Sequence, residues 1–442
     1  MAKFSSRRKR VIVSILSFSL IAQQSIVPAA IASVISGVGG VTGDSIIHGA
    51  NGDTIFNIAP QYHNPSGDVG FRQYENFNLS EGDIANLIYK YGSQDISSFV
   101  NFVQNKIDIN GIVNTMRDGQ FVNGNAVFVS PNGMVIGKSG VLNVGSLSVV
   151  TPTEEAYNKF TGTKDYYAPI LSAPGTPEYE TVINSLGGGA VTVNGKVLAR
   201  ENINIDAGKV DVGSTGALVT GVKSDKAFTP DGSYANDSID TQAKENGYDP
   251  EFGNPIREFN NSNMSNKESI TMAEVLFNNL VNTNITDASS IKNDKGSITI
   301  NAYNNDGGIT AYNGSIMKNF GAGDIKITNK GSQGTVLNGI IQNSDGNIIV
   351  ANDGGAVNIT GDILNVKGNT FISNSDKNIN INTGEITNLS GNTKIDANTR
   401  VLIEDAKISN SNGNLDIIAN SGIATNSSTV TNKNGNLNYT NS

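Results

Sequence analysis

The stretch from Gly124 to Val150, GNAVFVSPNGMVIGKSGVLNVGSLSVV, alternates very short apolar runs with turns. Its runs are separated by SPNG, GKSG and GS, which contain the glycine, proline, asparagine and serine typical of tight turns. Strands this short do not form stable hairpins alone, because an isolated two-stranded ribbon is marginal in water. Each run therefore needs a partner strand from elsewhere in the chain.

A repeat of about 22 residues in the C-terminal part of the chain supplies such partners. Glycine followed by alternating apolar positions recurs at Gly296, Gly323, Gly346, Gly368, Gly391, Gly413 and Gly435, with steps of 23, 22, 23, 22 and 22 residues from Gly323 onward. A second column consists of Ile340, Ile363, Ile386, Ile408 and Val430, with steps of 23, 23, 22 and 22. Two columns with one common period indicate a solenoid.

The repeat predicts an all-β fold, a right-handed parallel β-helix with an N-terminal cap and insertions outside the coils. Each strand would pair with the equivalent strand one coil later, about 4.8 Å along the axis. Alternation would place Ile298, Ile325 and Ile348 in one interior ladder. The turn asparagines Asn347, Asn369, Asn392, Asn414 and Asn436 would stack as amide ladders. An antiparallel sandwich is the alternative, but it predicts longer strands and turns 8–12 residues apart.

Proline usage marks the domain organisation, because all 11 prolines lie at or before Pro255 and proline is excluded from central strands. We divide the chain into a signal peptide (1–32), a capped β-helical domain (33–220), a polar insertion (221–292) and β-helix repeats (293–442). Within the second part, residues 153–185 show little alternation and are expected to leave the coil.

Two helices are expected from apolar spacing. One begins with Asp95 as its N-cap, places Ile96, Phe99, Val100 and Val103 on one face, and closes the open end of the solenoid. The other, at 269–281, packs against the side of the coils.

The N-terminus has the pattern of a secretory signal peptide. Arg7, Arg8, Lys9 and Arg10 precede an apolar run at 11–22, and Ala30-Ile31-Ala32 predicts cleavage between Ala32 and Ser33. A transmembrane anchor is the alternative, but 12 apolar residues are fewer than the roughly 20 that a span needs. We expect Sec-type export to the outside or the outer-membrane surface, and no membrane span in the mature chain.

Several function classes are disfavoured by composition. The chain has no cysteine, and its two histidines, His48 and His63, cannot form a zinc site by themselves. The formal charge of -9 argues against a nucleic-acid partner. The glycine-rich segment 37–43 opens no helix, so dinucleotide binding is not expected.

No catalytic residues are expected either. A β-helical enzyme that cleaves polysaccharides needs carboxylates gathered on one face. The scattered acidic residues Asp206, Asp324, Asp396 and Asp416 do not gather by the repeat period, which puts Asp324 and Asp416 at turns or edges. We therefore predict a protein that is not an enzyme and that has no cofactor or metal.

Three segments resemble the secretion domain of filamentous haemagglutinin-type proteins, and look most like leukotoxin-like filamentous adhesins. They are TIFNIAPQYHNPSGDVGFRQYENFNL from Thr54, INGIVNT at 109–115, and NAVFVSPNGMVIGKSGVLNVGSLSVVTPT at 125–153, within a resemblance that covers roughly 40–220. The resemblance implies a passenger of two-partner secretion (TPS), which crosses the outer membrane through a separate pore protein with periplasmic receptor domains.

The family's Asn-Pro-Asn-Gly-Ile turn corresponds here to Ser130, Pro131, Asn132, Gly133 and Met134. The resemblance makes these five residues the expected site of recognition by the secretion partner. Two of the five positions differ from the family pattern, and its second motif, Asn-Pro-Asn-Leu, has no clear counterpart.

The expected function is that of a secreted or surface-exposed adhesin with a host receptor that the sequence does not name. A leukotoxin, or the stalk of a contact-delivered toxin, is the alternative, and a polysaccharide-active β-helix enzyme is the second alternative. Because the last coil stops after eight residues, GNLNYTNS, we expect a short or truncated passenger.

Overall fold

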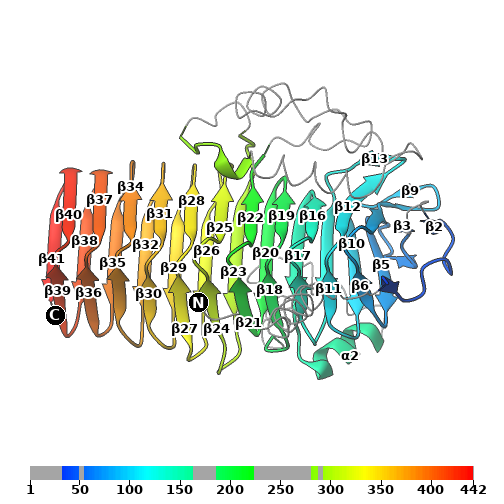
Figure 1. Ribbon diagram of the computed structural model, residues 1–442, viewed down its shortest axis with the longest axis horizontal. Helices are drawn as coiled ribbons and strands as arrows, with labels where there is room; N and C mark the ends of the chain where they lie inside the picture. The colour runs from blue at the N-terminus through cyan, green and yellow to red at the C-terminus, as the bar shows by residue number, and fades with distance from the viewer. Residues whose placement is uncertain (1–31, 49–53, 163–185, 223–279, 287–291, 442) are drawn as a thin grey trace, which may run out of the picture. The chain divides into compact units, whose positions relative to one another are not determined.

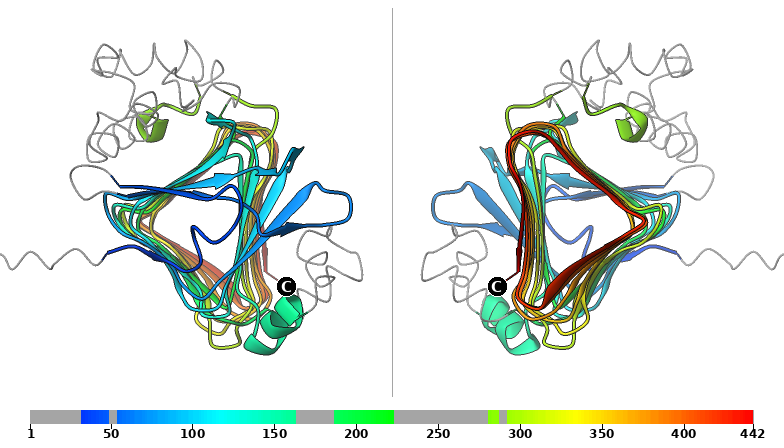
Figure 2. Two further views of the ribbon diagram at one scale, coloured as in Figure 1. Left: turned by 90° about the vertical axis from the view of Figure 1, so that its right-hand side faces the viewer. Right: turned by 90° about the vertical axis from the view of Figure 1, so that its left-hand side faces the viewer.

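Three long sheets form the body of the protein, in a computed structural model that describes residues 32–48, 54–162, 186–222, 280–286 and 292–441. The chain passes from sheet to sheet in a fixed order, and successive coils overlie one another as a three-sided outline when viewed along the axis (Figures 1 and 2). All neighbouring coils from β5 onward pair in parallel in the three sheets. The predicted parallel β-helix is therefore confirmed.

Sheet A has 12 strands. They are, in spatial order, β1 (Val34–Ile35), β6 (Phe77–Leu79), β11 (Ile107–Ile109), β15 (Met134–Ile136), β18 (Ala190–Val193), β21 (Lys209–Val212), β24 (Gly308–Ala311), β27 (Gly334–Leu337), β30 (Val357–Ile359), β33 (Ile379–Asn382), β36 (Arg400–Glu404) and β39 (Gly422–Asn426).

Sheet B has 14 strands, of which β13 (Gln120–Phe121) lies off the main path and pairs with β12. Its strands include β2 (Ser45–His48), β3 (Thr54–Ile58), β7 (Ile84–Ile88), β12 (Ile112–Arg117), β16 (Val141–Val144), β19 (Lys196–Ala199), β22 (Ala217–Thr220), β25 (Ile316–Asn319), β28 (Ile340–Asn343), β31 (Asp362–Asn365), β34 (Glu385–Asn388), β37 (Lys407–Asn412) and β40 (Thr429–Asn434).

Sheet C has 13 strands. They are β4 (Tyr62–His63), β5 (Val69–Tyr74), β10 (Ser98–Val103), β14 (Asn125–Val129), β17 (Ser146–Val150), β20 (Asn202–Ala207), β23 (Ser297–Ala302), β26 (Ile325–Asn329), β29 (Ile348–Asn352), β32 (Thr370–Asn374), β35 (Thr393–Ala397), β38 (Leu415–Ala419) and β41 (Leu437–Asn441). A separate hairpin joins β8 (Lys90–Tyr91) to β9 (Gln94–Asp95), and α2 spans Glu154–Gly162.

The short runs between Gly124 and Val150 find their partners one coil away, as expected. Strand β14 lies between β10 and β17, and Val127 pairs with Val100 on one side and with Ser148 on the other. Each coil contributes one strand to sheet C, one to sheet A and one to sheet B, in that order. Backbone groups that no local hairpin would satisfy are thus bonded along the axis.

The predicted interior ladder is present. Ile298 pairs with Ile325, which pairs with Ile348, and all three side chains are buried. The second column is correct from Ile363 onward but wrong at its first member, because Ile340 pairs with Asp362 and Ile341 with Ile363. Ile340 is 38% exposed and Ile341 only 1%, since a shift of one residue turns a strand side chain to the opposite face.

The turn asparagines form the expected ladder, with one change in its chemistry. The backbone N–H of Asn369 donates to the side-chain oxygen of Asn347 at 3.0 Å, and that of Asn392 donates to Asn369 at 2.9 Å. Asn414 and Asn436 continue the pattern at 2.9 and 3.2 Å. Most rungs of this ladder are therefore backbone-to-side-chain bonds, rather than bonds between side-chain amides.

The helix predicted from Asp95 is wrong. Asp95 ends β9, and Ser98–Val103 is strand β10. Phe99 and Val103 belong to the interior cluster, whereas Val100 and Phe102 belong to a second cluster beneath α2. Because both faces of the strand are buried, the period of two is hidden and the apolar positions imitate helical spacing.

Antiparallel strands, rather than a helix, cap the N-terminal end. Strand β1 pairs with β6, β2 with β3, and β4 with β5, each in the antiparallel sense. A buried ion pair holds this cap, since Arg72 Nη2 donates to Asp44 Oδ2 at 2.8 Å and both side chains are at most 2% exposed. Arg72 also donates to the carbonyl oxygens of Gly37 and Ala59, so one guanidinium joins the cap to the first coil.

Two insertions leave the coils. The first begins with α2, which packs on the outer face of sheet C through Ala156, Tyr157 and Phe160. The second contributes 280–286, where Leu280 and Ile285 pack into an apolar cluster beside sheet B. Except for Leu280 and Val281, which are helical, the helix predicted at 269–281 lies outside the described residues. In the described part, no helix combines the length and apolar character that a membrane crossing requires.

Lys318 holds the second insertion against the coil. Its Nζ donates to the carbonyl oxygens of Val281 and Thr283, both at 2.6 Å, and the side chain is buried. Burial lowers the pKa of Lys318 to about 8.

Deleting one whole coil, residues 391–412, is expected to leave a folded protein. The deletion joins Ser390 to Gly413 and places Ile417 over Ile372, so every remaining strand meets a partner in the same register. Circular dichroism should show the same β signal, and thermal unfolding should remain cooperative. Deleting only 391–401 breaks the register and is the matched control; equal behaviour of the two deletions would contradict this assignment of the repeat.

The cap is expected to weaken in acid. Burial by itself raises the pKa of Asp44, but the hydrogen bonds and charge of Arg72 and the amides of Ala59 and Gly39 outweigh burial and lower it. The ionised carboxylate therefore stabilises the folded cap above the unfolded pKa of about 3.9, and this stabilisation is lost as the pH falls through the lower folded value. Hydrogen exchange of β1–β3 should accelerate there, and Asp44→Asn should remove that pH dependence.

Removing Arg72, the other partner of this ion pair, is expected to destabilise the cap strongly. Arg72→Met leaves a buried carboxylate without its partner, which typically costs about 3–5 kcal/mol. Lys90→Met is the control, because Lys90 and Asp118 form an exposed pair worth about 0–1 kcal/mol. Local opening free energies from hydrogen exchange measure both effects, and similar losses in the two variants would show that the cap does not depend on Arg72.

Candidate recognition site

The turn Ser130–Met134 connects β14 to β15 at the corner between sheets C and A. Gly133 N–H donates to Ser130 O at 3.3 Å, and Asn132 N–H donates to Ser130 Oγ at 3.2 Å. Four of its five residues are buried, and only Asn132 is exposed. The structure thus presents one polar side chain on a fixed turn.

The turn is hydrogen-bonded to the corners of the coils before and after it. Toward the preceding coil, Ser130 Oγ donates to Asn105 O at 2.9 Å and Asn132 Nδ2 donates to Gln104 O at 2.8 Å. Toward the following coil, Gly189 N–H donates to Pro131 O at 2.7 Å. These bonds fix the conformation of the turn in the folded protein.

Gly133 is required by both conformation and space. Its φ is 84°, in the left-handed region that favours glycine. A Cβ at this position would lie 2.1 Å from the carbonyl oxygen of Ala190. The next coil therefore stacks directly on this glycine.

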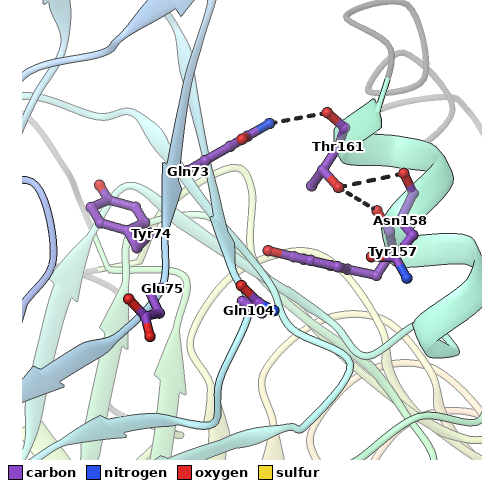
Figure 3. Close-up of a pocket in the computed structure, with 7 residues that line it drawn as sticks. All are labelled: Gln73, Tyr74, Glu75, Gln104, Tyr157, Asn158 and Thr161. Atoms are coloured by element: carbon purple, nitrogen blue, oxygen red, sulfur yellow. Dashed lines mark hydrogen bonds between the residues drawn. The ribbon is translucent and has the colours of Figure 1, made fainter.

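A shallow pocket of about 290 Å³ lies at the same corner, between α2 and the coils (Figure 3). Its lining comprises Gln73, Tyr74, Glu75, Gln104, Tyr157, Asn158 and Thr161. Gln104 connects the pocket to the turn, because its carbonyl oxygen accepts the bond from Asn132. The turn and the pocket are thus parts of one surface.

Sequence reasoning missed α2 and the pocket. The signal was present in part: Thr153 Oγ1 caps the helix by accepting from Ala156 N–H, and Glu154 and Glu155 fill its first turn. The pocket left no such signal, since its lining comes from β5, the end of β10 and α2, which are distant in sequence.

The predicted cleavage residues lie immediately ahead of β1. Ala32 is exposed and Ser33 is half-buried, while 1–31 lie outside the described residues. His48 lies in β2, and His63 in β4 packs edge-on against Tyr91 with a centroid distance of 4.6 Å. Within the described ranges, no group of three or more histidine or acidic side chains could hold a metal ion.

The four acidic residues considered for catalysis are bonded in separate places. Asp206, in β20, accepts from Asn301 Nδ2 at 2.8 Å; burial raises its pKa, and this outweighs the lowering by its bonds to Asn301 and Tyr303. Asp396 in β35 pairs with Lys394 at 2.8 Å. Both carboxylates are thus already bonded, whereas a catalytic pair of acid and base would need them free.

The remaining two carboxylates are also bonded. Asp324 lies in a turn, as expected, where it accepts from the backbone N–H of Asn347 at 2.7 Å. Asp416 lies within β38 rather than in a turn, and it accepts from Asn438 Nδ2 at 2.6 Å.

These elements define the class of protein as a capped parallel β-helix with outer-face insertions. No protein-family model and no curated protein sequence matches the chain. Among solved structures, it is similar to the filamentous hemagglutinin secretion domain, at 12% identity and a TM-score of 0.28, over 92% of this chain and 99% of that one.

It is also similar to the HMW1 secretion domain from Haemophilus influenzae, at 12% identity and a TM-score of 0.27, over 93% of this chain and 100% of that one. Values this low carry no argument about function.

Substituting Gly133 should destabilise more than substituting a glycine that has open space. Gly133→Ala combines a positive φ with the contact to Ala190 O, whereas a Cβ on Gly119, where φ is 77°, would have no atom within 4 Å. Gly119→Ala should cost about 1–2 kcal/mol from conformation alone, and Gly133→Ala should exceed it by about 1–3 kcal/mol for the forced contact. Denaturant unfolding compares the two, and equal losses would show that the stacked contact is unimportant.

Proposed function

We propose that this chain is a non-enzymatic passenger of two-partner secretion that functions as an adhesin outside the cell. A separate outer-membrane pore would export it, and the periplasmic receptor domains of that pore would recognise the first part of the mature chain, 33–220. The signal peptide, 1–32, would be removed between Ala32 and Ser33.

The observation that carries this proposal is the shared location of the family-like segments. The segments at 54–79, 109–115 and 125–153 resemble filamentous haemagglutinin-type secretion domains, and they fall on β3–β6, β12 and β14–β17. Those strands belong to the cap and the first coils. The family-like segments thus all lie in the N-terminal part of the solenoid.

Coil formation supplies a physical reason for outward movement during export. Each new coil buries side chains such as Leu142, Val144 and Leu147 against the coil before it. A buried leucine or valine contributes on the order of 1.5 to 3 kcal/mol. Folding outside the cell would therefore oppose return through the pore.

Recognition would take place before folding. In the extended chain, the strands of the first coils have unpaired backbone groups, which a receptor domain binds by adding a strand to its own sheet. The segment Ser130–Met134 is the candidate for side-chain recognition, because proline and glycine restrict it to a turn even in an otherwise extended chain.

The adhesin function is proposed from the shape of the solenoid, whose long faces are extended binding surfaces. A leukotoxin, or the stalk of a contact-delivered toxin, is compatible with the same fold, because one fold hosts many functions. The bonded carboxylates Asp206, Asp324, Asp396 and Asp416 give the polysaccharide-active enzyme no support.

Export tests the proposal. The double variant Asn132→Asp with Gly133→Val should block surface display in cells that express the partner pore, with the chain cleaved at its signal peptide and retained in the periplasm. Cell-surface labelling and fractionation measure the two pools.

A matched control separates recognition from folding. Gly334 in the distal repeats matches Gly133, because its φ is 77° and a Cβ there would lie 2.2 Å from the carbonyl oxygen of Ala356. Gln333 before it is exposed, so Gln333→Glu with Gly334→Val should disturb one coil to a similar extent and still allow the chain to reach the surface. Equal retention of both variants would mean that the first turn acts through folding and is not a recognition site.

A further inference from the structure

Asparagine followed by glycine occurs ten times in the sequence, and eight of these pairs lie in the described part of the chain. In such a pair the backbone nitrogen of the glycine can attack the side-chain amide of the asparagine and close a succinimide ring. Glycine favours this attack, because it has no Cβ in the way and its backbone moves easily. Which of the eight pairs reacts in the folded protein therefore depends on how each pair is held.

The pair Asn313–Gly314 lies in the turn between β24 and β25, at a corner between sheets A and B. Ser315 N–H donates to Tyr312 O at 2.9 Å and closes the turn, and Gly314 has a φ of 90°. Tyr312, Asn313 and Gly314 are exposed. Among the described residues, neither the Asn313 side-chain amide nor the Gly314 N–H has a hydrogen-bond partner, so water alone solvates both reacting groups.

In the other seven described pairs, at least one reacting group is hydrogen-bonded within the protein. Asn132 and Asn412 each donate from Nδ2 to a backbone carbonyl oxygen, at 2.8 and 2.9 Å, and the N–H of the glycine that follows is bonded as well. One or more such bonds are present in the pairs that begin at Asn110, Asn123, Asn194, Asn338 and Asn434.

Hydrogen bonding, rather than exposure, sets Asn313 apart. Asn123, Asn412 and Asn434 are as open to solvent as Asn313, since all four are exposed. A bonded amide or N–H must first break its bond before the glycine nitrogen can reach the amide carbon. That cost adds to the barrier of the reaction at the bonded pairs and not at Asn313.

We propose that Asn313 is a site of spontaneous deamidation in the folded protein. The Gly314 nitrogen loses its proton and bonds to Asn313 Cγ, and the side-chain nitrogen leaves with that proton as ammonia. Water then opens the succinimide. Cleavage between the Gly314 nitrogen and Cγ gives aspartate, and cleavage between this nitrogen and the backbone carbonyl carbon gives isoaspartate. Water is the only co-reactant, and the inference is independent of the secretion route because it concerns the folded protein.

The reaction changes both the charge and the backbone of this corner. Either product adds one negative charge to a formal charge of -9. Isoaspartate also lengthens the main chain by one methylene group, in a turn that stacks on the preceding coil. A Cβ on Gly314 would lie 2.6 Å from Ser214 O, and Ile316 N–H donates to Gly216 O at 3.0 Å. The corner therefore has little room for a longer chain.

The test compares two sites in one sample. The purified chain is incubated at mildly alkaline pH and digested, and mass spectrometry quantifies aspartate and isoaspartate at Asn313 and at Asn412. We expect Asn313 to react about 5- to 150-fold faster, because two hydrogen bonds of ordinary strength protect the Asn412–Gly413 pair. The rate at Asn313 should rise with pH, since the attacking nitrogen must lose its proton.

Two controls separate the fold from the local sequence. In guanidinium chloride that unfolds the chain, the two sites should react at similar rates, because both are Asn-Gly pairs. Asn313→Gln should remove the product at this position and leave the rate at Asn412 unchanged, since glutamine would have to close a larger ring. Equal rates in the folded chain, or a faster reaction at Asn412, would overturn the proposal. A preference for Asn313 that persisted in denaturant would overturn it too, because the fold would then not select the site.

Discussion

Parallel pairing between successive coils is the interaction on which the rest of this structure depends. Apart from β13, which pairs with the adjacent β12, the described strands of the coils find their partners one coil away, so the backbone is satisfied only when one coil lies in register on another. This requirement explains the fixed period of about 22 residues, the interior ladder of Ile298, Ile325 and Ile348, and the close stacking at Gly133. It also requires a different structure at the first coil, which the antiparallel cap and the Arg72–Asp44 pair provide.

Asparagine side chains supply hydrogen bonds at the corners between sheets, where strand pairing ends. Where the chain turns from sheet B to sheet C, Asn319, Asn343 and Asn365 are completely buried. Asn319 Nδ2 donates to Asn343 Oδ1 at 2.8 Å, and Asn365 Nδ2 donates to Asn369 O at 3.0 Å. A corner carbonyl that no strand partner reaches is thus bonded by a side chain, which gives a physical reason for the abundance of asparagine in this chain.

The coils differ in what covers their outer faces. Most outward positions of the repeats are half-exposed, but α2 covers Val127 and Val129, and 280–286 covers Val219 and Phe320. Where a face is covered, both sides of the strand become apolar, as in β10. The pocket at α2 is formed where this helix packs against the coils, so its lining comes from an insertion as well as from the coils.

The sequence by itself determined the solenoid, its period, the interior ladder from Ile298 and the asparagine ladder, because these features repeat and each coil experiences the same environment. It also identified Ser130–Met134 as a distinct turn. Only the tertiary structure decided that Ser98–Val103 is a strand, that Ile341 rather than Ile340 faces inward, and that Tyr157 and Gln104 line one pocket. The reason is that burial on the outer face depends on segments distant in sequence, and a period read from one strand cannot reveal what covers it.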